Sequence, residues 1–292
     1  QNGLKLQEEQ GFDPFRFGMT AASDSHVAGG AYAETDFWSK IGIVDGLPFQ
    51  RGSVPMPGIK DWADQPDNQT TQNAKHWFSR WSASGLTGVW AEENTRDAIF
   101  DAFRRKETFA TTGPRMKVRF FGGFGYTADT LNAPDLAKQA YAGGVAMGGD
   151  LVGTGEAPSF IAWAIRDANA APLQRVQVVK VTSSGEAVYD AACSGGATPD
   201  ANHRCPDNGA SVDIATCTTT DGSGAGELKA LWTDPDFVPG QRATYYVRVL
   251  ENPTCRWSTW EANRNGTPPN PDLPTTIQER AYTSPIWYIP PA

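Results

Sequence analysis

Histidine is scarce in this sequence, with only His26, His76 and His203 among 292 residues. No His-x-His pair occurs, and no Gly-x-Ser-x-Gly motif of the kind that carries the nucleophile of an α/β-hydrolase. Because so few bases are present, the sequence argues against a serine nucleophile activated by histidine.

The sequence also lacks a run of basic residues and an apolar run of the ~18 to 20 residues that a membrane-spanning helix needs. Its formal net charge is −8, from 25 Lys and Arg against 33 Asp and Glu, and its pI is about 5.0. An acidic chain of this kind does not bind nucleic acid or anionic lipid nonspecifically. We therefore expect neither nucleic acid nor a membrane as a partner. An apolar fraction of 39% is enough for a substantial core.

Four cysteines are present, and all lie in the C-terminal third, at Cys193, Cys205, Cys217 and Cys255. Their spacing matches neither a zinc knuckle nor a redox Cys-x-x-Cys motif, so disulfides are favoured. Of the three possible pairings we favour Cys193 with Cys205 and Cys217 with Cys255, since the first closes one short loop. Disulfides imply an oxidising compartment and hence a periplasmic or secreted protein. Free buried thiols in a cytosolic protein are the alternative.

Residues 18–26 end in an Asp-x-His pair, Asp24 and His26. On an extended segment, residues two apart project to the same side, so this carboxylate and imidazole can converge on one cation. The pair is thus a candidate metal site. The alternative is a strand that runs into a turn, with Asp24 accepting local backbone hydrogen bonds and His26 simply exposed.

Further segments carry a resemblance that covers nearly the whole chain in order. They are FG and SDSH within residues 17–26, GLTGVWAEENTR at 85–96, ATTGPR at 110–115, RFFGG at 119–123, YYVRVL at 245–250, RWST at 256–259, QERAY at 278–282 and SPIWY at 284–288. On these segments the chain resembles the uncharacterised DUF3604 family, which is similar to the PHP-type metallohydrolases named for polymerase and histidinol phosphatase. The resemblance implies a distorted β/α barrel and a cluster of divalent metals to which a late Asp-x-His contributes. Only Asp24 and His26 carry over into that role.

The chain departs from the family in one respect. Family members resemble a longer protein whose earlier half carries a His-x-His motif and further His, Asp and Glu ligands. The sequence therefore resembles only the C-terminal half, and residues 1–10, polar and compatible with a helix, read like the middle of a longer chain. A centre of two or three metal ions needs roughly four to six protein ligands, so this chain would supply only part of one. We expect the N-terminal half to be cleaved, lost or supplied by a second chain. A processed mature N-terminus is the ordinary alternative.

The first part of the chain, residues 1–115, is expected to be the C-terminal portion of the PHP-like β/α domain. Residues 15–22 predict a buried strand before the Asp-x-His turn. Residues 86–91 predict a strand and residues 96–106 an amphipathic helix with Thr95 as its N-cap. In a β/α barrel Glu92 and Glu93 would lie near the site and bind substrate, although complementing the helix dipole is the favoured explanation for both. Arg115 is a candidate catalytic or substrate-binding residue that would pair with an anionic group, or it anchors its loop to a carboxylate.

The second part, residues 116–292, changes character. Strands are predicted at 116–121, 159–165, 173–182 and 243–250, with weak helical periodicity at 129–139. This region is expected to be a β-rich accessory domain resembling a β-sandwich and pinned by disulfides. The predicted fold class is therefore α/β followed by all-β.

The function that these patterns favour is metal-assisted hydrolysis of a phosphoester, with a sulfate ester or an amide as less favoured substrates. Zinc, manganese or iron suits a mixed imidazole and carboxylate shell better than calcium does. Two alternatives remain. One is a noncatalytic secreted binding module for a glycan or a protein, since the chain has ten tryptophans, among them Trp77, Trp81, Trp90, Trp257, Trp260 and Trp287. The other is a proteolytic fragment that is inactive alone.

Overall fold

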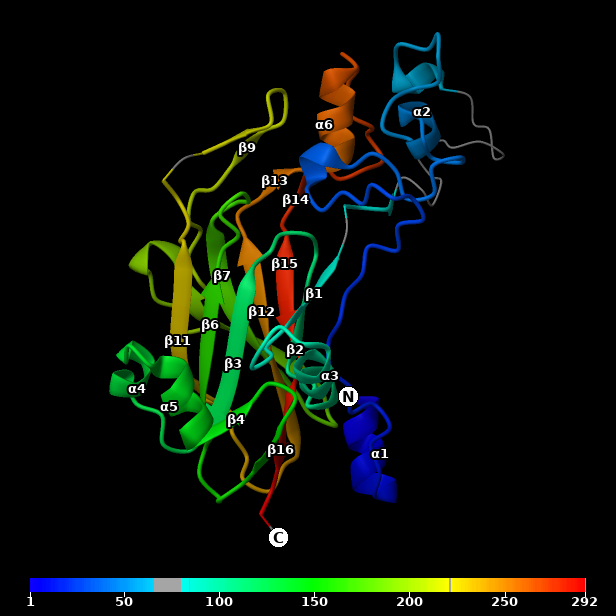
Figure 1. The fold of residues 1–292 in the computed structure, drawn as a ribbon. Helices are drawn as coiled ribbons and strands as arrows, with labels where there is room; N and C mark the ends of the chain where they lie inside the picture. The colour runs from blue at the N-terminus through cyan, green and yellow to red at the C-terminus, as the bar shows by residue number, and fades with distance from the viewer. Residues whose placement is uncertain (66–79, 84, 221, 292) are drawn as a thin grey trace.

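The structure is a computed structural model that describes residues 1–65, 80–83, 85–220 and 222–291, and its centre is a pair of stacked β-sheets (Figure 1). The larger sheet has eight strands. From one edge they are β1 (Leu86–Val89), β2 (Thr108–Thr111), β15 (Arg280–Thr283) and β12 (Ala243–Glu251), after which the sheet continues through β16 (Ile286–Ile289) to β5 (Asp150–Val152) and through β7 (Leu173–Val181) to β8 (Glu186–Cys193). All these pairs are antiparallel except β16 with β5.

The smaller sheet has four antiparallel strands in the order β11, β6, β3, β4. They span Glu227–Thr233, Ser159–Ile165, Lys117–Gly123 and Gly144–Ala146. Two short ribbons stand apart from both sheets, namely β9 (Val212–Asp213) with β10 (Thr218–Thr219), and β13 (Thr254–Cys255) with β14 (Thr276–Ile277).

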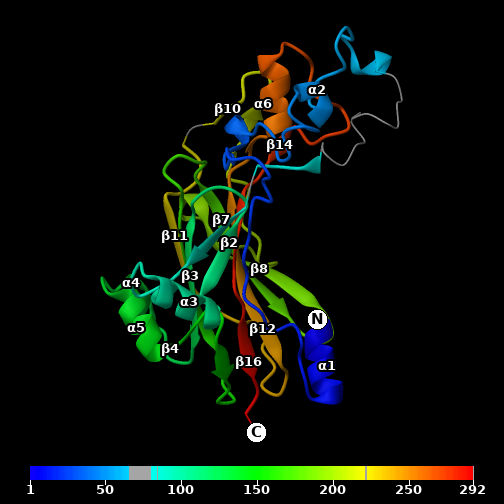
Figure 2. The same ribbon diagram turned by 45° about the vertical axis from the view of Figure 1, so that its right-hand side comes forward.

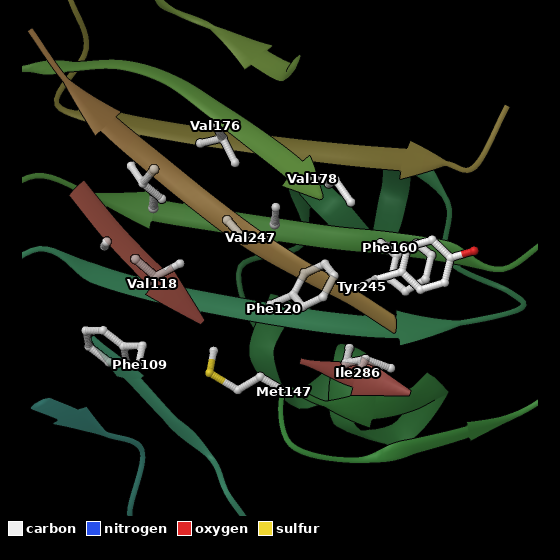
Figure 3. Close-up of a cluster of buried hydrophobic side chains, with 14 of the residues drawn as sticks. Phe109, Val118, Phe120, Met147, Phe160, Val176, Val178, Tyr245, Val247 and Ile286 are labelled. Atoms are coloured by element: carbon white, nitrogen blue, oxygen red, sulfur yellow. The ribbon is translucent and has the colours of Figure 1, made fainter. Parts of the chain in front are cut away.

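The main hydrophobic core lies between the two sheets (Figure 3). Phe120 of β3 and Phe160 of β6 stack with ring centroids 5.4 Å apart, and Phe160 lies 4.5 Å from the ring of Tyr245 on β12. Along β12 every second residue is buried, which is the pattern of a strand with one face on a core. Val176 and Val178 of β7 complete the facing layer.

Two helices cover the outer face of the smaller sheet. The helices α4 (Ala128–Asn132) and α5 (Leu136–Gly143) pack over the outer face of the smaller sheet, where Leu136 and Ala140 contact Phe121 and Ile161. Further helical segments are α1 (Asn2–Gln10), α2 (Pro48–Arg51), α3 (Arg96–Arg104), α6 (Trp257–Arg264) and the 3-10 turns Glu34–Asp36, Trp62–Asp64 and Ser194–Gly196.

One end of the sandwich carries an irregular lobe formed by residues 27–65 and α6 (Figure 2). Phe37 packs on Trp257 there, with ring centroids 4.7 Å apart, and Ala83 joins this small cluster. Arg51, which is 2% exposed, forms a bidentate ion pair with Glu261 on α6. This pair fixes residues 27–65 to α6 within the lobe, because both charges are largely removed from water.

Two disulfides are present, Cys193–Cys205 and Cys217–Cys255, in the pairing favoured from the sequence. The first joins the end of β8 to the following loop. The second joins the β9–β10 ribbon to β13, at the same end of the sandwich as the lobe.

Most predicted strands of the second half are confirmed, with β3, β6, β7 and β12 within two residues of their expected bounds. The strand and helix at 86–106 are confirmed as β1 and α3, and the Thr95 hydroxyl accepts the N–H of Ala98 as an N-cap. The helix expected at 129–139 is split into α4 and α5, because Pro134 forces the preceding Ala133 into an extended conformation.

The strand predicted at 15–22 is not formed. Its backbone groups bond to side chains instead of to a strand, as Met19 N–H does to Ser284 and Ala21 N–H does to Thr87. The expected β/α arrangement is not formed either. In a β/α barrel the strands before and after a helix are parallel, whereas β1 and β2, which α3 connects, pair antiparallel. Within the described ranges no sheet closes into a barrel, so the fold is mixed α and β with a large open sheet.

The domain boundary expected at residue 115 stays a prediction. β2, which precedes it, pairs with β15 from the C-terminal end, so residues on both sides of 115 share the larger sheet.

Candidate functional site

The Asp-x-His segment is anchored on the side of the larger sheet. The Thr108 hydroxyl donates to the carbonyl of Met19 at 2.8 Å, and Thr87 both accepts from the N–H of Ala21 and donates to its carbonyl. Beyond the pair, the N–H of His26 donates to the carbonyl of Lys40 at 2.7 Å. The segment is therefore fixed before and after Asp24, with few contacts of its own in between.

Asp24 and His26 are both exposed, and within the described residues neither side chain has a hydrogen-bond partner. Asp24 has a positive φ of 54°, which Asp tolerates better than most residues but which breaks a regular extended chain. The same-side geometry expected of a strand does not apply at this point. What the structure supplies instead is a turn that presents a free carboxylate and a free imidazole to the outside.

A metal held here would need more ligands than the described part of the chain brings together. No group of three or more His, Cys, Asp or Glu side chains in the described ranges is placed to hold a metal ion. His76 lies outside those ranges, and His203 packs edge-on against the ring of Tyr189 in the β8 region. Asp24 and His26 have the donor atoms that zinc, manganese or iron prefers, and they are uncommitted, so they fit the role of two ligands in a shared site.

The other candidate residues lie at opposite ends of the β1–β2 hairpin. Glu92 and Glu93 follow the end of β1 at Val89, whereas Arg115 follows β2 beyond Thr111, which pairs with Leu86 at the start of β1. The chain before Asp24 passes this second end, since a Cβ on Gly85 would meet Ala21 and Ala22. Arg115 therefore shares an end of the sheet with Asp24 and His26, and the two glutamates do not.

Glu92 lines a cavity of about 860 Å³ whose walls come from residues 90–92, residues 105–107 after α3, β3, α5 and residues 145–150. The guanidinium of Arg119 lies 3.6 Å over the ring of Trp90 there and donates to the hydroxyl of Tyr141, which bonds in turn to Glu107. Burial, together with Glu107, raises the pKa of Tyr141 to about 12. These groups satisfy one another, so this cavity offers few free partners to a ligand.

A second cavity, of about 400 Å³, lies at the Arg115 end. Arg115 is exposed there, and its backbone N–H donates to Asp167 at 2.7 Å. Any residue could make this bond, so both expected roles of the Arg115 guanidinium stay predictions. Three buried carboxyl groups, from Glu34, Glu251 and Glu279, line the same cavity.

Two of these three carboxyl groups have partners. Glu34 accepts the N–H groups of Ala83 and Trp257, and Glu279 accepts the hydroxyl of Thr112. Burial raises the pKa of Glu34 and raises the pKa of Glu279 to about 7. The hydrogen bonds of Glu34 and Glu279 therefore stabilise the lobe and the neighbouring loops, and neither carboxyl group needs a ligand to satisfy it.

Glu251 differs, because it is 1% exposed and its buried Oε1 has no hydrogen-bond partner among the described residues. Burial, with a smaller contribution from the negative charges of Glu279 and Asp167, raises its pKa to about 9. The sequence did contain a signal for this residue. The alternation of β12 that buries Tyr245, Val247 and Val249 continues to position 251, which places a carboxyl on the core face.

Comparison with known proteins decides the family. The model of the family described as "Protein of unknown function (DUF3604)" matches residues 1–290. The chain is a DUF3604 protein. The family expected from the sequence is thus confirmed, while its likeness to PHP-type enzymes and the restriction to a C-terminal half stay predictions. No curated protein and no solved structure matches the chain.

The tryptophans of this DUF3604 protein serve mainly in packing. Trp257 and Trp287 are buried, and the indole N–H of Trp90 donates to the carbonyl of Val118 on β3. Trp81 and Trp260 are partly buried, and Trp77 lies outside the described residues. None of the helices in the described ranges has both the length and the apolar character of a membrane span.

Proposed function

We propose that this DUF3604 protein is a metal-dependent hydrolase and that the chain contributes Asp24 and His26 to its metal site. The observation that carries the proposal is their state in the structure, since both side chains are exposed, and without a partner in the described part of the chain, on a turn that is fixed on both sides. An exposed carboxylate and imidazole that only stabilised a turn would be expected to bond to nearby backbone groups. These two do not.

The remaining ligands would come from a PHP-like β/α barrel in residues outside this chain, either an N-terminal half or a second chain. A bound zinc, manganese or iron ion would supply a water of lowered pKa and polarise the substrate oxygen. Arg115 is on the same end of the sheet and is exposed, so its guanidinium is free to orient an anionic substrate. A phosphoester is the substrate class that this charge favours, ahead of a sulfate ester.

Glu92 and Glu93 are omitted from the proposed site because they follow the other end of β1. Two disulfides support a periplasmic or secreted location, where such bonds persist. A noncatalytic glycan-binding module remains the alternative, but the burial of Trp257 and Trp287 leaves it with fewer aromatic surfaces than the sequence suggested.

The test is elemental analysis by inductively coupled plasma mass spectrometry, together with hydrolysis of a chromogenic phosphodiester. It is applied to the full protein, to the Asp24→Ala/His26→Ala double variant and to a Glu92→Ala/Glu93→Ala control. We expect stoichiometric transition metal and activity in the wild type and the control, and loss of both in the Asp24 and His26 variant. Equal metal content in all three proteins would refute the assigned ligands, and a wild type that stays metal-free after supplementation would refute the hydrolase.

A further inference from the structure

The smaller cavity is built from segments that lie far apart in the sequence. Its walls come from residues 32–35 after the Asp-x-His turn, residues 113–115 after β2, residues 167–172 before β7 and the β10, β13 and α6 regions. These elements meet at the lobe end of the sandwich (Figure 1). A volume of about 400 Å³ is within the usual range for a small-molecule site.

Glu251 is the unexplained group in this cavity. A buried polar atom without a partner costs about 1–3 kcal/mol, and more when it is charged, so native proteins rarely retain one without a reason. The position is the last of a strand whose other inward residues are apolar, and an apolar side chain would pack there without that cost. No described side chain or backbone donor reaches Oε1.

The groups around Glu251 favour a cation. Glu34, Glu279 and Asp167 also line the cavity, so four carboxyl groups face one small volume. Tyr32 and Trp260 line it as well, and aromatic rings beside carboxylates are the usual surroundings of a bound ammonium group. A metal ion is disfavoured, because no three of these carboxyl groups lie close enough together to share one in the described ranges.

We propose that this cavity binds a small molecule carrying a primary ammonium group, with the Glu251 carboxylate as its buried partner. The ammonium satisfies the unpartnered oxygen and is stabilised by the surrounding negative charge. Arg115, exposed at the same cavity, would bind two classes of ammonium ligand differently, namely α-amino acids and simple amines. A ligand that also has a carboxylate, such as an α-amino acid, gains an ion pair with Arg115, and a simple amine does not.

Isothermal titration calorimetry tests the proposal on the full protein with 1,4-diaminobutane, lysine and the neutral isostere 1,4-butanediol. We expect saturable binding of at least one ammonium ligand and none of the diol. Glu251→Gln should weaken binding by about tenfold or more, since a hydrogen bond to a charged group is lost. An exposed control, Glu156→Gln, should bind as the wild type does. Lysine binding lost in Arg115→Ala, with diaminobutane unaffected, would assign an amino acid as the ligand.

Proton release gives a second readout that does not depend on a variant. The Glu251 carboxyl is held by burial in its protonated form and faces Glu279, Asp167 and Arg166, so ammonium binding near neutral pH should release a proton. Calorimetry in buffers of different ionisation enthalpy measures it. Affinity should then rise with pH.

Equal binding of amine and diol, or no binding of any ammonium ligand at millimolar concentration, would overturn the proposal. The Asp24→Ala/His26→Ala variant should bind amines like the wild type. Failure of the metal-site assignment is therefore distinguishable from failure of the ammonium-site proposal.

Discussion

Replacing Glu251 by Gln should change how the stability of the protein depends on pH. The folded-state pKa of this carboxyl is raised from 4.5 to about 9 by burial, with Glu279 and Asp167 adding to the effect and Arg166 opposing it. In the unfolded chain the group ionises near its ordinary value. Between the two pKa values the folded state binds more protons than the unfolded state, so stability is fully present below about pH 4.5 and is lost as the pH rises.

The size of the stability change follows from the pH interval between the unfolded-state and folded-state pKa values of Glu251. Each pH unit over which only the unfolded carboxyl is ionised lowers the free energy of unfolding by about 1.4 kcal/mol. From about pH 5 to about pH 7 the wild type should therefore lose roughly 3 kcal/mol that the Glu251→Gln variant does not lose. Glu279, whose pKa is raised to about 7, contributes a similar slope to both proteins and cancels in their difference.

Urea unfolding at a series of pH values measures this difference, with the exposed Glu156→Gln as the control. Comparing slopes removes any constant offset from placing an amide in the same site. If the wild type and the Glu251→Gln variant lose stability in parallel from pH 5 to pH 7, Glu251 ionises normally in the folded protein and the argument from burial is refuted.

Three further changes test what holds the fold together. Arg51→Met leaves Glu261 in a partly buried position without its ion pair, and chemical denaturation should show a loss of about 3–5 kcal/mol. Phe160→Ala removes the ring that packs between the two sheets and should cost about 3–5 kcal/mol by the same measurement, whereas an unchanged midpoint would contradict its place in the core. Replacing Cys217 and Cys255 by Ser opens a loop with a sequence separation of 38, and thermal unfolding should report a loss of roughly 4 kcal/mol.

The strands of the sandwich were predictable because their signal is local. Alternation along residues 243–251 and the apolar runs at 159–165 and 173–181 depend only on which face of each strand is buried. The N-cap at Thr95 is local for the same reason, since a hydroxyl needs only the N–H three residues later.

Pairing was not predictable in this way. Residues 15–22 have the composition of a strand, yet their backbone groups are taken by the hydroxyls of Thr87, Thr108 and Ser284, which are 66 or more residues away. The antiparallel pairing of β1 with β2 and of β2 with β15 likewise depends on tertiary contacts. A helix between two strands suggests a parallel crossover from sequence, and only the register shows that α3 connects a hairpin.

The same distinction between local patterns and tertiary contacts applies to the candidate site residues. Asp24 and His26 could be proposed from their spacing, and Arg115 from its motif, because each is a short pattern. The carboxyl-lined cavity could not, since Glu34, Glu251 and Glu279 come from three separate segments that meet only in the folded chain. The alternation of β12 indicates that Glu251 points inward, but not that its oxygen lacks a partner.

Glu251 keeps its position through its backbone and its neighbours. Its N–H donates to the carbonyl of Glu279, and its own carbonyl accepts from the Gln278 side chain. The next residue, Asn252, bonds to Pro172 through its N–H and to Asn208 through its side chain. Because the main chain is fixed on both sides, the carboxyl cannot leave the wall of the cavity by a small shift of the strand. A buried polar group that costs stability and is held in place by its surroundings is characteristic of a binding site formed before its ligand arrives. A tolerated packing defect would not require main-chain hydrogen bonds that hold the group in position.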